Sequence, residues 1–154
     1  DKASFKILVH EIIDSFKDLS KKKIIINEDD YKKDYLITKK IEIIYSFKNI
    51  IDNALKFSSN KIEIFLLSNE NELRIKVIDD GQGFSKQALG FLGDPYINKR
   101  DLDNNKEGLG LGIFIAKVFL ERLSAVINFY NLENKGAAVD ISWQKKDLIN
   151  LKLI

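Results

Sequence analysis

The stretch KEGLGLGIFIAK, residues 106–117, decides the fold of this chain. It places Gly108, Gly110 and Gly112 directly before an apolar run that predicts a helix. The start of a helix carries free backbone N–H groups and a positive dipole end, and both favour phosphate. The run lacks the Gly-Lys-Ser/Thr ending of a Walker A loop. A long polar segment precedes it, where a Rossmann fingerprint needs an early strand, so another nucleotide fold is indicated.

The composition is that of a single globular domain. The chain has 154 residues, 45% of them hydrophobic and 31% charged, with a formal net charge of +2. This near-balance gives no reason to expect nucleic acid or a membrane surface as a partner. The absence of cysteine excludes disulfides and thiolate metal sites, whereas an oxygen-ligated ion such as magnesium stays open. The chain has no methionine, no signal peptide and no apolar segment long enough for a bilayer, so we expect a domain excised from a longer protein.

Hydrophobic periodicity predicts helices alternating with pairs of strands. The first helix should bury a stripe that ends at Leu19, and the second, capped by Thr38, a stripe that begins at Ile41. Helices on one face of a mixed sheet fit this order better than a doubly wound parallel sheet. The expected helices cover residues 4–19, 39–58 and 112–123, and the expected strands cover 22–27, 35–37, 61–67, 73–78, 125–130 and 137–143.

The segment NIIDNALKF, residues 49–57, lies inside the second predicted helix. Asn49 and Asn53 are four residues apart and so share one helix face, with Asp52 and Lys56 beside it. Most such polar clusters are solvated faces. Asparagine is a mediocre helix former, however, so two at this spacing favour amide oxygens that serve as ligands.

The segment DDGQGF, residues 79–84, follows a predicted strand. Asp-Gly at a strand end is first of all a turn signal. The alternative is functional: Gly81 and Gly83 would let the backbone approach a ligand closely, and an adjacent carboxylate would accept a hydrogen bond from it.

Taken in this order, the three segments resemble the ATP-binding catalytic (HATPase_c) domain of sensor histidine kinases, in the wider GHKL family shared with gyrase, Hsp90 and MutL. NIIDNALKF resembles the N box, DDGQGF the G1 box, EGLGLGIFIAK the G2 box, and KGAAV (135–139) a weaker G3 region. FLGDPYINKR (91–100) further resembles a stretch of the RegB/PrrB redox-responsive kinases. The resemblance implies the Bergerat ATP-binding fold, an α+β two-layer sandwich whose mixed, mostly antiparallel sheet is covered on one face by about three helices.

The resemblance also implies a role for each matching residue. Asp79 would accept the adenine amino group, with Gly81 and Gly83 shaping the pocket, and Asn53 would ligate a Mg2+ ion that bridges the phosphates of ATP. Asn49 and Lys56 would flank the phosphate chain. Residues 90–107 would form the ATP lid of a single catalytic domain, residues 1–154, and Arg100 would neutralise charge on the transferred phosphoryl group. The remaining nucleotide-binding positions would be Phe57, Gly108, Leu109, Gly110, Leu111 and Gly112.

The residue at position 49 discriminates between two reactions. In the ATP-hydrolysing relatives this position is typically Glu, which activates water, and an amide cannot act as that base at neutral pH. The sequence therefore favours phosphoryl transfer to a histidine over a GHKL-type ATPase. A degenerate nucleotide-binding regulatory module is a third possibility, because Leu109 and Ala137 stand where threonine is common. Asp94 replaces the glutamate of the RegB type and keeps its charge.

The histidine acceptor is expected outside this chain. His10 is followed by IIDSFKD, which has no proline and does not resemble the acceptor motif, so we interpret it as a surface or interface histidine. The resemblance implies a cytoplasmic domain of a bacterial inner-membrane sensor, with no direct membrane contact of its own. Its partners would be the dimerisation and phosphoacceptor domain of its own homodimer and a response regulator. The isolated domain should be a monomer that does not phosphorylate itself.

Overall fold

The fold is seen in a computed structural model, which describes residues 1–93 and 110–151. Five strands form one sheet in the order β2-β4-β5-β7-β6, in which only the β2–β4 pair is parallel. The elements of this sheet and its helices are α1 (Phe5–Lys17), β2 (Lys23–Asn27), α2 (Ile41–Phe57), β4 (Lys61–Ser68), β5 (Glu72–Asp79), α3 (Lys86–Leu92), α5 (Gly110–Arg122), β6 (Val126–Asn131), β7 (Ala137–Gln144) and α6 (Lys145–Leu151). Two short strands, β1 (Lys2–Ser4) and β3 (Leu36–Thr38), pair separately and antiparallel.

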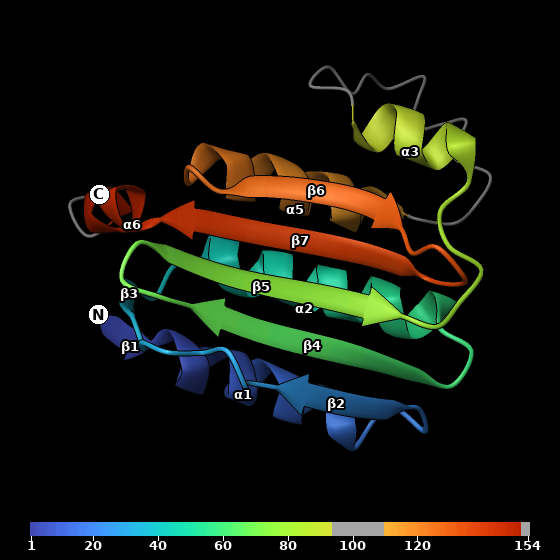
Figure 1. The fold of residues 1–154 in the computed structure, drawn as a ribbon, viewed down its shortest axis with the longest axis horizontal. Helices are drawn as coiled ribbons and strands as arrows, with labels where there is room; N and C mark the ends of the chain where they lie inside the picture. The colour runs from blue at the N-terminus through green and yellow to red at the C-terminus, as the bar shows by residue number, and fades with distance from the viewer. Residues whose placement is uncertain (94–109, 152–154) are drawn as a thin grey trace.

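The helices α1, α2 and α5 lie behind one face of the sheet, as Figure 1 shows. This arrangement confirms the expected α+β sandwich with a mixed, mostly antiparallel sheet. The predicted alternation in β5 is also confirmed, because Leu73, Ile75 and Val77 are buried while the residues between them are partly exposed. Edge-to-face contacts join Phe5, Phe47 and Trp143 at the centre of the layer between helices and sheet.

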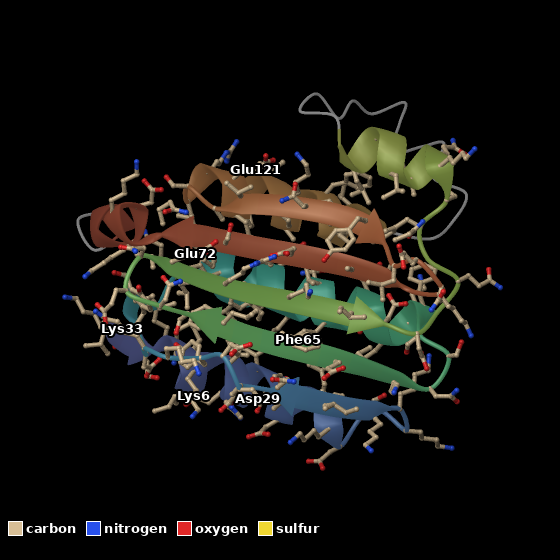
Figure 2. The ribbon with its side chains drawn as sticks, viewed as in Figure 1. Lys6, Asp29, Lys33, Phe65, Glu72 and Glu121 are labelled. Atoms are coloured by element: carbon tan, nitrogen blue, oxygen red, sulfur yellow. The ribbon has the colours of Figure 1, made fainter. Side chains whose placement is uncertain are left out.

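The opposite face of the sheet carries polar and charged side chains. Figure 2 shows Phe65 and Glu72 on this face. The ammonium group of Lys76 lies 5.4 Å from the centre of the Phe65 ring. Arg74 donates from Nε and Nη2 to the two carboxylate oxygens of Asp140 on the neighbouring strand. Lateral pairs of this kind keep the exposed strands compatible with solvent.

Several local predictions were wrong. Thr38 does not cap α2, because it pairs with Lys2 in the small sheet, and the N-cap is Lys40, without a side-chain hydrogen bond. Ile41 is 75% exposed and Leu19 is 84% exposed, so neither belongs to the buried stripe that periodicity assigned to it. The helix after the glycines starts at Gly110, so Gly112 lies inside its first turn. Strand β1 and the helices α3 and α6 were not among the predicted elements.

Three elements end or begin at one end of the sheet. There β5 ends at Asp79, β7 begins at Ala137, and α2 ends at Phe57. At the opposite end of the sheet, β7 ends where Gln144 pairs with Glu72, and α6 follows directly. Helix α2 also begins at that end, as Figure 1 shows. In the described part of the chain, no helix has both the length and the apolarity that crossing a bilayer would need.

Candidate functional site

The Asp79 carboxylate stands at the end of β5, on the helix-covered face. Its exposed fraction is only 8%, and its Oδ1 accepts hydrogen bonds from the backbone N–H groups of Gly81, at 2.8 Å, and Ala137, at 3.4 Å. Burial raises the pKa of the Asp79 carboxyl above its ordinary value, although these two donors act in the opposite direction. A buried acid on a glycine-rich turn is suited to accept a hydrogen bond from a ligand.

Gly81 brings the loop after β5 against the end of α2. A Cβ at this position would lie 3.0 Å from the carbonyl carbon of Phe57 and still closer to its oxygen. Real Cβ atoms hardly ever approach so closely, so only glycine permits this contact. The G1 and N segments, predicted separately, therefore meet at this point.

Asn49 and Gly112 make the corresponding contact between α2 and α5. A Cβ on Gly112 would lie 2.9 Å from Cγ of Asn49 and closer still to its Oδ1. The Asn49 amide nitrogen donates to the Tyr45 carbonyl oxygen at 2.8 Å, which fixes the side chain along the helix. The N and G2 segments thus meet at Asn49 and Gly112.

A cavity of about 630 Å³ opens between the end of α2 and the loop after β5. Lys56 and Phe57 of α2 line it together with Gly83 of the loop. The Lys56 ammonium lies 5.3 Å from the centre of the Phe57 ring. The residues that complete the lining are Ser59, Gln82, Phe84 and Ser85.

Two charged side chains without a predicted role fix the end of α2 and the turn after it. Lys22 donates from Nζ to the carbonyl oxygens of Leu55 and Ser58, at 2.6 and 2.7 Å, and so caps α2. The Asp80 carboxylate accepts hydrogen bonds from the backbone of the turn that follows α2, including one from Ser59 N–H at 2.8 Å. Desolvation alone would raise the pKa of the Asp80 carboxyl, but these backbone donors hold it below its ordinary value. Lys22 carried no sequence signal beyond its charge, whereas Asp80 lies inside the DDGQGF segment, where no role was predicted for it.

The remaining predicted site residues lie on α2, on α5 or outside the described part of the chain. Asn53 is half-buried on α2, one turn beyond Asn49. Leu111 is 56% exposed in the first turn of α5, which begins at Gly110. Arg100, Gly108 and Leu109 lie outside the described residues, as does most of the expected lid, 90–107.

His10 is not part of this site. It lies on α1, and its Nε2 contacts the Glu28 carboxylate, which also pairs with Lys6 at 3.0 Å. The ring is thus engaged at the surface, in keeping with the interpretation of His10 as a surface histidine.

Comparison with known proteins identifies the family. The family described as "Histidine kinase-, DNA gyrase B-, and HSP90-like ATPase" matches residues 38–147. Sensor histidine kinase RegB of Cereibacter sphaeroides is 30% identical over 131 residues, which cover 74% of this chain and 28% of that protein. The catalytic domain of histidine kinase ThkA superposes with a TM-score of 0.74 at 17% identity, covering 94% of this chain and 96% of that one. The mycobacterial sensor histidine kinase MprB superposes with a TM-score of 0.71 at 13% identity, covering 94% of this chain and 96% of that one.

The chain belongs to the family of histidine kinase-, DNA gyrase B- and HSP90-like ATPases. Within this family, the sequence is similar to that of a sensor histidine kinase, and the fold is that of a histidine kinase catalytic domain. The expected similarity to RegB is confirmed. The aligned part spans little more than a quarter of that relative's length.

Proposed function

We propose that this domain binds Mg-ATP and donates the γ-phosphoryl group to a histidine on a separate dimerisation domain. The observations that carry the proposal are the buried Asp79 carboxylate, held by Gly81 N–H where the loop after β5 meets Phe57, and the cavity that Phe57 and Gly83 line. A buried acceptor next to an aromatic ring and open backbone suits a flat heterocycle that carries an amino group.

The phosphates would lie toward α5. Asn49 and Asn53 present amide groups on one face of α2, and Gly112 lets the first turn of α5 approach Asn49 closely. The start of α5 would add its dipole to the site. Arg100 and the 90–107 lid stay predictions from the sequence.

The donor set fits magnesium. Among the described residues, no group of three or more His, Cys, Asp or Glu could hold a metal. The ion would therefore not be coordinated there by protein side chains alone. Mg2+ commonly binds through one or two protein oxygens together with phosphates and water, and the Asn53 amide oxygen suits this mode. When bound, the ion would neutralise charge on the phosphates.

Phosphoryl transfer is favoured over hydrolysis by Asn49. Its amide donates to the Tyr45 carbonyl oxygen and faces Gly112 with its oxygen, so this position offers no base for water. Steady phosphate release by the chain, abolished by Asn49→Ala, would instead support the ATPase alternative. ATP binding without phosphohistidine formation, once the dimerisation domain is added, would support a regulatory module.

The proposed partners are the dimerisation and phosphoacceptor domain of its own homodimeric kinase and a response regulator. The similarity to sensor kinases supports a cytoplasmic position in such a protein. By itself the chain should be monomeric and should not incorporate phosphate at His10.

The test is a calorimetric titration with a non-hydrolysable ATP analogue and Mg2+. Asp79→Asn should weaken binding about ten- to a hundredfold, because a hydrogen bond to a charged acceptor is lost. Asp14→Asn is the matched control, since this carboxylate is exposed on α1. No binding by the unsubstituted chain, or equal binding by Asp79→Asn, contradicts the proposal.

A further inference from the structure

The loop after β5 is held at its far end by the amide side chain of Asn131. Its Oδ1 accepts from the Phe84 N–H at 2.7 Å, and its Nδ2 donates to the Phe84 carbonyl oxygen at 2.8 Å. A single side chain therefore satisfies both backbone groups of Phe84, as a neighbouring strand would. Asn131 is the last residue of β6, and Figure 1 shows the β6–β7 turn beside this loop at one end of the sheet.

The backbone around this contact is shaped to fit it. Gly83 has φ +86°, and a Cβ there would lie 2.8 Å from the Asn131 Oδ1. A side chain at position 83 would be strained and would displace the amide. The Phe84 ring packs edge-on against Phe129, two residues before Asn131 on the same strand. The contact thus combines a bidentate amide, a left-handed glycine and an aromatic pair.

The same segment forms a wall of the candidate site. Gly83 and Phe84 line the same cavity as Phe57. The other end of the loop is fixed by Asp79, which accepts from Gly81 N–H. The Asn131 amide therefore fixes the part of the cavity lining that Gly83 and Phe84 form.

We propose that Asn131 is a positioning residue for the base of the nucleotide. This inference rests on the proposed function, because it assigns the cavity to the adenine side of ATP. Asn131 touches no reacting atom: it holds Gly83 and Phe84 in place in the lining of the cavity that the base would enter. Free of the amide, the loop would have to be ordered by the ligand itself, and this ordering would weaken binding.

The experiment uses the 154-residue chain and two ligands, a non-hydrolysable ATP analogue and inorganic tripolyphosphate, each with Mg2+. Asn131→Ala should weaken the ATP analogue about tenfold, the effect of losing one or two ordinary hydrogen bonds. Affinity for tripolyphosphate should not change, because that ligand has no base. Asn131→Asp should lose at least as much, since it keeps the acceptor for Phe84 N–H but turns an oxygen toward the Phe84 carbonyl.

The matched control is Asn128→Ala on the same strand. Asn128 is exposed on the opposite face of β6, so its loss should leave both affinities unchanged. Unchanged ATP-analogue affinity in Asn131→Ala would overturn the inference, and so would an equal loss for both ligands, which would mean a general structural effect. If the unsubstituted chain binds no ATP analogue, the proposed function fails first and this inference fails with it.

Discussion

The contact between Asn49 and Gly112 can be tested without any ligand. Gly112→Ala places a methyl group 2.9 Å from Cγ of Asn49 and closer still to Oδ1, whereas real Cβ contacts hardly ever fall under 3.0 Å. The amide must turn away and break its hydrogen bond to the Tyr45 carbonyl. Overpacking of this kind destabilises by about 1–3 kcal/mol. We therefore expect a loss of about 2 kcal/mol, which lowers Tm by about 4–8 °C in a chain of this size.

A double-mutant cycle assigns this loss to its cause. In an Asn49→Ala background the overlapping atoms are gone, and the nearest remaining atom, the Asn49 Cβ, lies 3.7 Å away, in ordinary contact. Gly112→Ala should then be neutral, or stabilising by up to about 1 kcal/mol because alanine is the better helix former. The coupling free energy should reach about 2 kcal/mol, well beyond the usual additivity error of about 0.5 kcal/mol.

The assay is urea unfolding followed by circular dichroism. Gly90→Ala in α3 is the control, since a Cβ there meets nothing within 4 Å, and it should be neutral or slightly stabilising. An equal loss from Gly112→Ala in both backgrounds would refute the contact between α2 and α5 as described.

Three further predictions concern the same end of the sheet. Asp79→Asn should raise the free energy of unfolding at pH 7, because burial disfavours the charged form. Since the folded pKa of Asp79 is raised, this advantage should shrink as the pH falls through that pKa toward 3.8, the value expected when unfolded, and a constant advantage in a denaturation series would contradict it. Gly136→Ala should cost more than about 2 kcal/mol, because φ is +112° and a Cβ would overlap the Asp79 carbonyl; a Tm like that of Gly90→Ala would be inconsistent with this. Lys22→Ala should lower stability by about 1–2 kcal/mol by uncapping α2, and an unchanged urea midpoint would exclude the cap.

The sequence was sufficient for the elements whose pattern is set by burial. The alternation in β5 and the buried face of α2 from Phe47 to Ala54 follow directly from one buried face, and both are confirmed, although the α2 stripe does not reach Ile41. Predictions failed where a neighbour far along the chain decided the outcome. Thr38 has the chemistry of a helix cap, but pairing with Lys2 takes it into a strand, and no local pattern contains that information.

The candidate site shows the same division. Asp79 and Gly81 could be selected because acid and glycine stand together in one motif. Asn131 could not, because a single asparagine at the end of a strand predicts only a turn. Its importance arises from Phe84, 47 positions away, whose backbone it meets only after the sheet has formed.

The course of α2 has a consequence for how the site could be influenced from elsewhere. The helix begins just after β3, which pairs with the N-terminal strand, and its 17 residues span about 25 Å before Phe57 meets Gly81. Strand β7 covers the same span in the other direction and continues into α6. A fluorophore or surface tether attached through β1 or α6 would leave the cavity beside Phe57 open. We expect a force applied there to be transmitted to the cavity along α2 or along β7. A spectroscopic probe at Phe57, the end of α2, or at Ala137, the start of β7, would detect such a displacement.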